Sequence, residues 1–237
     1  MTLRRLALTA LMFSCAPRNL IVLNKGVAGN STSDLVRRVE TDVLAFKPDI
    51  VILMGGTNDM VNSRKLASYE TFGANYQAII EKLKAQGTSV VMMNILPVDT
   101  TYLFQRHDRN AFDQRPNEKI DSANQLVHRI AMDHALLFID VNRAFKERNS
   151  PSHDASSLIL NMKNSGKEDG IHPTREGYVL IADMVFRVLK EQRLLKKDCT
   201  IVCFGDSITF GAYMDGAGTA DGDTYPAFLK RMILRKM

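Results

Sequence analysis

Five short apolar runs with helical patterns between them are the feature that most restricts how this chain can fold. The runs lack the alternation of polar and apolar residues that is typical of strands with one face in water. They therefore predict strands buried on both faces, which occur in parallel sheets covered by helices on each side. The expected strands are residues 20–24, 49–54, 89–95, 137–141 and 200–204, and the expected helices are residues 31–46, 70–86, 117–134, 178–195 and 225–237.

This order of elements predicts a three-layer α/β/α sandwich with a five-stranded parallel sheet, a flavodoxin-like arrangement. The run at 200–204 comes last in the sequence, yet its final four residues are all apolar. An edge strand would tolerate polar residues on one face. We therefore expect this last strand in the interior of the sheet.

Size and composition fit one globular domain. The chain has 237 residues, of which 45% are hydrophobic and 24% are charged, and these values are ordinary for such a domain. The net charge of +5 is carried by scattered Lys and Arg residues rather than by a dense basic stripe, so we expect no nucleic-acid partner. No apolar run is long enough to span a bilayer. Three cysteines indicate neither a disulfide framework nor a metal site.

The N-terminal segment allows two interpretations. Two arginines precede an apolar stretch at residues 6–13, and a Ser-Cys pair follows it. This pattern resembles a secretory signal, with a loose likeness to a lipoprotein cleavage site; the alternative is a short helix packed on the domain. The first predicts a secreted protein or a lipoprotein and the second a cytoplasmic protein. In both cases residues 1–18 are an extension of one domain at 19–237.

Four short motifs follow expected strands, either directly or within one loop. Because parallel sheets of this kind form their sites at the carboxyl ends of the strands, we expect the motifs to lie together. Each alone is common, as a turn, a loop glycine or a helix cap. Together they indicate one catalytic site. They are Gly205-Asp206-Ser207-Ile208, Gly26-Val27-Ala28-Gly29-Asn30, Gly55-Gly56-Thr57-Asn58-Asp59 and Asp169-Gly170-Ile171-His172-Pro173.

The residue types in these motifs suit chemistry with a serine nucleophile. A serine hydroxyl such as that of Ser207 needs an adjacent base, and a histidine such as His172 needs an orienting carboxylate. Asp169 lies three residues before His172, so one compact turn can present both. A developing oxyanion needs hydrogen-bond donors already in place. The candidates are the Ser207 N–H, the Gly29 N–H and the side-chain amide of Asn58.

On these motifs the sequence resembles the SGNH hydrolases, also called GDSL esterases and lipases. The likeness implies that Ser207 is the nucleophile, that His172 is the base, and that Asp169 orients the base. It assigns the oxyanion hole to Ser207, Gly29 and Asn58. It also implies a carboxylic ester hydrolase that needs no metal and no organic cofactor. The family's blocks one, two, three and five resemble residues 205–211, 26–29, 56–59 and 169–172.

The order of the motifs departs from that family, in which the serine block comes first. Moving the first βα unit of the family fold to the end of the chain would give the order found here. The sequence thus predicts a circularly permuted member whose nucleophile segment is residues 199–237. The nucleophile must reach the base while lying near both oxyanion motifs. This requires the strand at 200–204 to lie between the strands at 20–24 and 49–54.

Three further residues are candidates for contact with the substrate: Asp206 in the serine motif, and Val98 and Tyr102, which together with Phe104 would form an acyl pocket. The loop at 212–224 is rich in Gly and Asp and suits an open, polar rim. We expect a small-molecule ester with a short acyl group on a sugar, an alcohol or a lipid. Two alternatives stay open: acyl transfer to an acceptor other than water by the same triad, and a catalytically silent, flavodoxin-like binding module.

Overall fold

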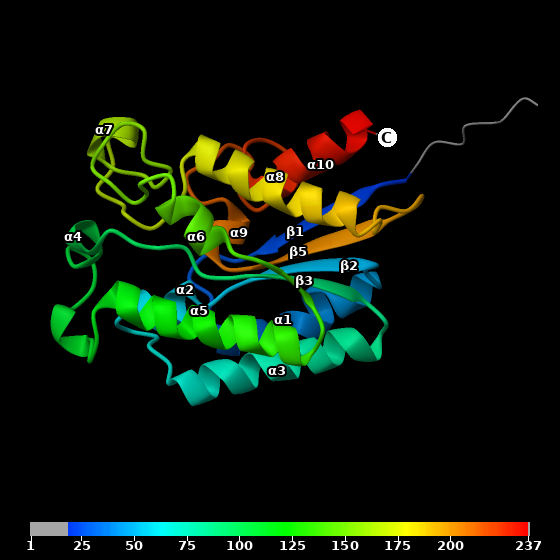
Figure 1. The fold of residues 1–237 in the computed structure, drawn as a ribbon, viewed down its shortest axis with the longest axis horizontal. Coiled ribbons are helices and arrows are strands. Elements are labelled where there is room, and N and C mark those ends of the chain that lie inside the picture. Colours follow the sequence, from blue (N-terminus) through cyan, green and yellow to red (C-terminus); the bar gives the residue numbers. More distant parts are fainter. Residues whose placement is uncertain (1–18, 237) are drawn as a thin grey trace, which may run out of the picture.

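The computed structural model describes residues 19–236 as a central sheet between two layers of helices (Figure 1). The five strands have the order β1-β5-β2-β3-β4, and every pair is parallel. The predicted α/β/α fold is therefore confirmed. Both interpretations of residues 1–18 concern a segment outside the described residues. The strands are β1 (Ile21–Gly26), β2 (Ile50–Met54), β3 (Ser89–Met93), β4 (Leu137–Ile139) and β5 (Thr200–Gly205).

Long helices cover the two faces of the sheet (Figure 1). On one face lie α1 (Thr32–Asp42), α3 (Tyr69–Ala85) and α5 (Pro116–Asp133), and on the other lie α8 (Arg175–Glu191) and α10 (Tyr225–Lys236). Helix α1 packs against α3, α3 against α5, and α8 against α10. Short elements connect these parts: α2 (Thr57–Val61), α4 (Thr100–Leu103), α6 (Val141–Lys146), α7 (Met162–Ser165), α9 (Ser207–Phe210) and the 3₁₀ turns η1 (Leu44–Phe46) and η2 (Arg109–Ala111).

The last strand lies inside the sheet, as predicted. Strand β5 pairs with β1 along its whole length and with β2 on its other side. Its residues Ile201, Val202 and Phe204 are completely buried. Burying each such side chain stabilises the fold by roughly 1.5–3 kcal/mol. The end of the sequence therefore contributes to the centre of the core.

The observed elements differ from the predicted ones mainly at their ends. The helix expected at 31–46 is divided, because Val43 leaves the helical backbone conformation with φ −124°. The helix expected to continue to residue 195 ends at Glu191, and Arg193 adopts a left-handed φ of 53°. The short helices were not predicted, since an apolar period needs more than one or two turns to be visible in a sequence.

Candidate active site

Ser207, His172 and Asp169 lie together at the carboxyl edge of the sheet. The Nε2 atom of His172 is 2.9 Å from the Oγ atom of Ser207, although 35 residues separate them in the chain. On the opposite side of the ring, Nδ1 is 2.9 Å from Oδ2 and 3.0 Å from Oδ1 of Asp169. A hydroxyl, an imidazole and a carboxylate in this order can activate the hydroxyl as a nucleophile.

The end of β5 presents Ser207 at the first position of α9. The preceding residue, Asp206, is the N-cap of this helix, and its Oδ1 accepts the backbone N–H of Ile208 at 2.9 Å. The first N–H groups of a helix have no partner within the helix. The N–H of Ser207 is consequently available to a substrate oxygen.

Two glycines let α9 approach the ends of the strands closely. A Cβ at Gly26, at the end of β1, would lie 2.0 Å from the backbone N of Phe210. A Cβ at Gly205, at the end of β5, would lie 2.4 Å from Oγ1 of Thr209 in α9 and 1.9 Å from the carbonyl oxygen of Met54 in β2. A larger residue at Gly26 would push α9 away from the sheet edge, and one at Gly205 would displace both α9 and the neighbouring strand β2; either change would move Ser207.

A tight turn presents Asp169 and His172. Oδ1 of Asp169 accepts the backbone N–H groups of Ile171 at 2.9 Å and of His172 at 2.6 Å. Gly170 has φ 72°, a left-handed conformation that glycine adopts without steric cost. A Cβ there would also lie only 2.9 Å from the Cβ of Asp99. The turn itself therefore fixes the carboxylate against the imidazole.

The Asp169 carboxyl is buried, at 2% exposed, and is held in its ionised form. Burial alone would raise its pKa. The hydrogen bond and charge of the His172 side chain, with the backbone N–H groups of His172 and Ile171, outweigh burial and hold the pKa of Asp169 well below its usual value. The side chain is therefore a carboxylate at neutral pH.

Arg106 is a site residue that the sequence did not indicate. Its Nη1 lies 3.1 Å from Oδ2 of Asp169, and its Nη2 donates to the backbone carbonyl of the same residue. The two residues are 63 positions apart, and no motif surrounds the arginine. Only the path of its loop brings it to the triad.

Gly29 lies in the cleft beside Ser207 and His172. It has φ 77°, and a Cβ added there would meet nothing within 4 Å. A glycine is therefore favoured here by the left-handed backbone and not by lack of space. Lys65 donates from Nζ to the carbonyl of Gly29 at 2.8 Å and to Oδ2 of Asp34 at 2.9 Å. This link, also absent from the predictions, restrains the loop.

Asn58, on α2 directly after β2, lines the same cleft. Its Nδ2 donates to the carbonyl of Asn30 at 3.0 Å, and its Oδ1 accepts from Nδ2 of Asn62 at 3.0 Å. Because an amide nitrogen carries two hydrogens, one is left for a substrate oxygen. The next residue, Asp59, anchors α2 by accepting the backbone N–H of Thr32 at 2.9 Å.

The cleft around these groups has a volume of about 260 Å³. Apolar side chains of Val61 and Ile171 contribute to its wall, together with Ala212 and Tyr213. The Tyr213 ring stands nearly perpendicular to the ring of His172, at an interplanar angle of 79° and a centroid distance of 5.3 Å. The cleft is therefore small and has an aromatic ring beside the imidazole.

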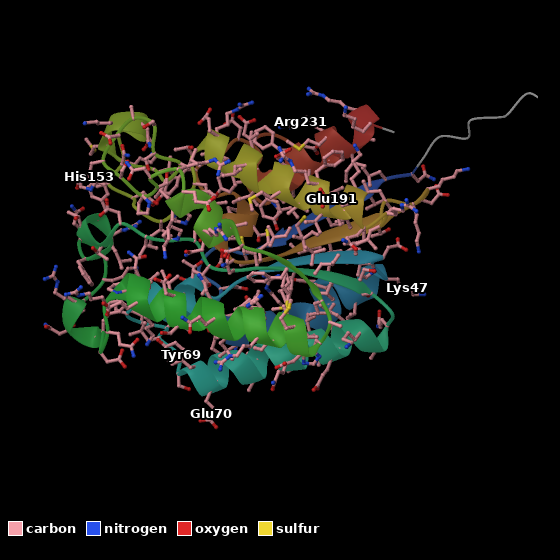
Figure 2. All side chains as sticks on the ribbon, viewed as in Figure 1. Lys47, Tyr69, Glu70, His153, Glu191 and Arg231 are labelled. Atoms are coloured by element: carbon pink, nitrogen blue, oxygen red, sulfur yellow. The ribbon has the colours of Figure 1, made fainter. Side chains whose placement is uncertain are left out.

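The three expected substrate contacts do not line this cleft, and the predicted acyl pocket is wrong. Val98 is 1% exposed in the core, where its N–H and carbonyl bond the side chain of Asn117. Tyr102 is 7% exposed and stacks on His153, which Figure 2 labels near α4. Asp206 is completely buried as the cap of α9, and burial raises its pKa. The apolar residues after β3 continue into the core and do not turn toward the site.

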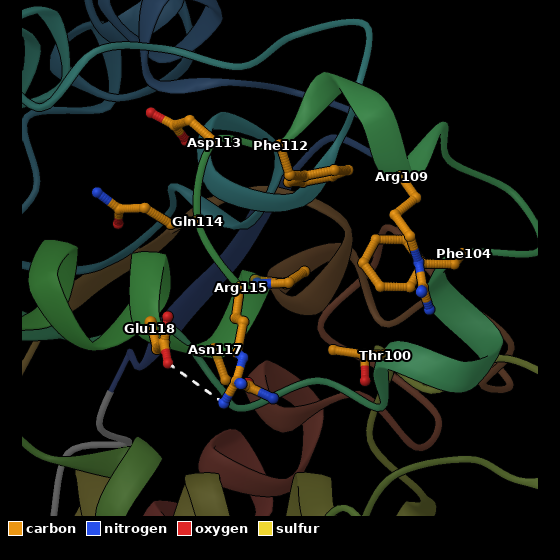
Figure 3. Close-up of a pocket in the computed structure, with 10 residues that line it drawn as sticks. Thr100, Phe104, Arg109, Phe112, Asp113, Gln114, Arg115, Asn117 and Glu118 are labelled. Carbon is orange, nitrogen blue, oxygen red and sulfur yellow. Dashed lines mark ion pairs between the residues drawn. The ribbon is translucent and has the colours of Figure 1, made fainter.

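A larger cavity, of about 790 Å³, lies elsewhere on the surface (Figure 3). The rings of Phe104 and Phe112 meet edge to face at 5.7 Å in it, and the Arg109 guanidinium lies 4.5 Å from the centre of the Phe104 ring. None of the residues that line it belongs to the cleft of Ser207. Size alone therefore does not identify the site of the chemistry.

The structure brings together the hydroxyl of Ser207, the imidazole of His172 and the carboxylate of Asp169. Within residues 19–236, no cluster of three or more His, Cys, Asp or Glu side chains has the arrangement to hold a metal ion. Among the helices of that same stretch, none combines the length and apolar character needed to cross a membrane.

Comparison with known proteins gives the class of this protein. Residues 6–180 match the model of the GDSL-like lipase/acylhydrolase family, and the chain belongs to this family of carboxylic ester hydrolases. The predicted family and enzyme class are confirmed. The matched stretch contains Gly29, Asn58, Asp169 and His172 and ends before β5.

Two relatives and one solved structure resemble this chain over about 70% or more of its length. The chain is 28% identical over 170 residues to an acetylxylan esterase from Geobacillus stearothermophilus, with 70% of each chain covered. It is 25% identical over 192 residues to the uncharacterized lipoprotein YqeF from Bacillus subtilis, with 76% of each covered. The crystal structure of a GDSL-like lipase from Bacteroides thetaiotaomicron superimposes with a TM-score of 0.55 at 21% identity, over 71% of this chain and 75% of that one. This last likeness shows a shared fold.

Proposed function

We propose that this protein is a serine esterase that hydrolyses short-chain acyl esters of carbohydrates. The observation that carries the proposal is the 2.9 Å distance from His172 Nε2 to Ser207 Oγ, with Asp169 on the far side of the ring. Residues 19–237 form the catalytic domain, and the nucleophile belongs to its last segment.

The first half of the reaction acylates the enzyme. Ser207 Oγ attacks the ester carbonyl carbon while its proton passes to Nε2 of His172, and Asp169 stabilises the imidazolium that forms. The carbonyl oxygen becomes an oxyanion, which accepts hydrogen bonds from the Ser207 N–H, the Gly29 N–H and the Asn58 amide. The carbon–oxygen bond to the alcohol then breaks, and Nε2 returns the proton to the departing oxygen.

The second half releases the acid. Water attacks the acyl carbon while His172 removes its proton, and a second oxyanion forms against the same donors. When this intermediate collapses, the bond to Ser207 Oγ breaks and Nε2 protonates that oxygen. A carboxylic acid leaves, and the hydroxyl is restored.

The size of the cleft supports short acyl groups. It has about 260 Å³ for the acyl group and the reacting carbon, and Val61 and Ile171 contribute apolar surface to it. Each additional methylene must find a place outside this space. We expect kcat/KM to be highest for acetate and to fall as the acyl chain lengthens.

For the alcohol part of the ester substrate, the proposal draws on a relative. The acetylxylan esterase that is 28% identical to this chain acts, by its name, on an acetylated polysaccharide. The polar rim at residues 212–224 suits such an alcohol. A carbohydrate ester is therefore the substrate class to test first.

The proposal is tested with Ser207→Ala and a fluorophosphonate that labels activated serines. Wild-type protein should hydrolyse a chromogenic acetate and take up one label, and the variant should do neither while keeping the wild-type circular dichroism and melting temperature. Ser122, exposed on α5, is a matched control whose change to Ala should leave both readouts unchanged. Labelling that persists in Ser207→Ala would overturn the assignment.

Product analysis separates hydrolysis from the two alternatives. With an added alcohol or sugar, hydrolysis gives free acetate, whereas an acyltransferase gives a new ester. A silent binding module gives neither product and takes up no label. Free acetate as the main product supports the esterase.

A further inference from the structure

A second cavity, of about 600 Å³, adjoins the catalytic cleft, and the Tyr213 side chain lines both. Lys167 and Arg175 also line the second cavity, with three serines, one asparagine and Glu176. Because one side chain forms part of both walls, a molecule bound in the cleft can extend past Tyr213 without displacing the core.

The Tyr213 ring is presented to solvent at this junction. The residue is 54% exposed, although large aromatic residues usually bury most of their surface. Its backbone has φ 68°, a left-handed conformation that a bulky residue rarely adopts. Its ring packs almost perpendicular to that of His172, and Nζ of Lys167 lies 5.0 Å from its centroid. The ring is thus held beside the imidazole with part of its surface uncovered.

The chemistry of ester cleavage indicates on which side of the cleft the alcohol part of the substrate lies. In the mechanism above, His172 protonates the departing alcohol, so the alcohol oxygen must lie next to Nε2. The carbonyl oxygen points instead toward Gly29 and Asn58. The alcohol part of the substrate therefore leaves the cleft on the side of the imidazole, where Tyr213 stands.

The side chains beyond Tyr213 determine what kind of alcohol fits. Two cations of this cavity have acidic partners: Lys163 lies 3.7 Å from Asp154, and Arg175 lies 3.2 Å from Asp223. Lys167 has no ion-pair partner among the described side chains, so its ammonium is available to donate to a hydroxyl. A pyranose ring combines an apolar C–H face with a rim of hydroxyls, which matches an aromatic ring beside a hydrogen-bond donor.

We propose that Tyr213 and Lys167 form the leaving-group subsite and bind the pyranose ring of a sugar ester, with the ring stacked on Tyr213. This inference rests on the proposed esterase function. The larger cavity of Figure 3 also offers aromatic rings, at Phe104 and Phe112, but it shares no lining residue with the cleft. If the sugar binds at Tyr213, changing Tyr213 should impair hydrolysis of sugar esters and changing Phe112 should not. If the sugar binds in the larger cavity, the reverse is expected.

The test compares kcat/KM for a monoacetylated methyl xyloside with kcat/KM for ethyl acetate, whose alcohol is too short to extend along the second cavity. The readout is the ratio of the two values, which cancels changes in the chemistry common to both esters. Tyr213→Ala should lower this ratio about tenfold, the scale of losing one good contact to a substrate group. Tyr213→Phe, which keeps the ring, should restore most of it. Lys167→Met should lower it about threefold.

Phe112→Ala is the matched control from the other cavity and should leave the ratio at the wild-type value. The proposal is overturned if Phe112→Ala lowers the ratio and Tyr213→Ala does not, or if neither changes it. A wild-type enzyme that takes up the fluorophosphonate label and hydrolyses only ethyl acetate overturns the sugar subsite and leaves the esterase in place. A protein that takes up no label and hydrolyses neither ester overturns both.

Discussion

The guanidinium of Arg106 lies 3.1 Å from Oδ2 of Asp169, the same oxygen that faces Nδ1 of His172 at 2.9 Å. One carboxylate oxygen thus contacts both the guanidinium of Arg106, which is always charged, and the imidazole of His172. The arginine side chain is 37% exposed, so solvent screens part of its effect. The guanidinium still places a positive charge beside the carboxylate that faces the imidazole.

Replacing this arginine should change the pH dependence of the reaction. In Arg106→Gln a positive charge beside the catalytic carboxylate is lost, so the site takes up protons more readily and activity on the acid side should fall at a higher pH. We expect the acid limb of kcat/KM to move upward by a few tenths to about one pH unit. Arg106→Lys keeps the charge and should keep the limb close to that of the wild type. An unmoved limb in Arg106→Gln would show that the arginine only supports the fold.

Removing the Asn58 amide should affect the transition state more than the bound substrate. Asn58→Ala is expected to lower kcat by roughly 10²–10³, the scale for one lost oxyanion donor, with little change in KM. Asn62→Ala removes the group that donates to Asn58 Oδ1 at 3.0 Å and should lower kcat less, because the amide itself remains. If Asn58→Ala raises KM and leaves kcat unchanged, Asn58 binds ground-state substrate instead.

The sequence predicted those features that depend on local pattern. Strands β2 and β5 are continuous apolar runs, so the sequence predicted that both of their faces are buried. The pairing of Asp169 with His172 was visible because one turn holds both residues. The Gly29 and Asn58 motifs follow strands, and the parallel sheet brings the ends of those strands together.

Other features depend on how distant loops pack and leave no local pattern. Arg106 reaches Asp169 from 63 residues away, and Lys65 reaches Gly29 from 36 residues away. Tyr213 is one aromatic residue in a polar loop, and nothing beside it indicates that its ring meets His172. The prediction that Val98 lines an acyl pocket was wrong because its local pattern is ambiguous. An apolar residue after a strand suits either a pocket or the core, and here Val98 is buried in the core.

The Asp34 carboxylate should make stability depend on pH. It closes the capping box of α1 with Ser31 and pairs with Lys65. Burial raises its pKa, but the hydrogen bonds from Ser31 and Lys65 and the charge of Lys65 outweigh burial and lower the pKa to about 2. Since the folded value is below the unfolded one, the stabilisation is present above about pH 4 and is lost as the pH falls toward 2.

We expect Asp34→Asn to lower the free energy of unfolding by about 1 kcal/mol at pH 7, the scale of a weakened cap with a partly exposed ion pair. Urea unfolding at pH 7 and at pH 3 measures the change, which should be smaller at pH 3. Asp133→Asn, at the exposed end of α5, is the control and should have little effect at either pH. An equal loss at both pH values would contradict the linkage.

We propose that the chain is a circularly permuted member of its family. Two observations support this: β5 lies between β1 and β2 although it comes last, and the family match ends at residue 180, before the serine motif. Removing residues 198–237 should therefore prevent folding. The deleted segment includes Ile201, Val202 and Phe204, whose burial is worth roughly 1.5–3 kcal/mol each, and a whole domain is stable by only about 5–15 kcal/mol. A truncated protein with wild-type stability and a cooperative melt would contradict a central β5.

A rearranged chain tests the permutation itself without deleting any residue. The chain is opened between Lys197 and Asp198 and closed between Met237 and Met1, so that the serine motif comes first and residues 1–18 join α10 to β1. The end of α10 and the start of β1 lie at the same end of the molecule, so a joint between them is feasible (Figure 1). If the family fold is permuted here, this chain should fold with a similar melting temperature and hydrolyse acetate esters with a kcat/KM within about threefold of the original, because the same strands and side chains meet. A rearranged chain that is insoluble, or folded but without fluorophosphonate labelling at Ser207, would argue that the present order is needed for the fold.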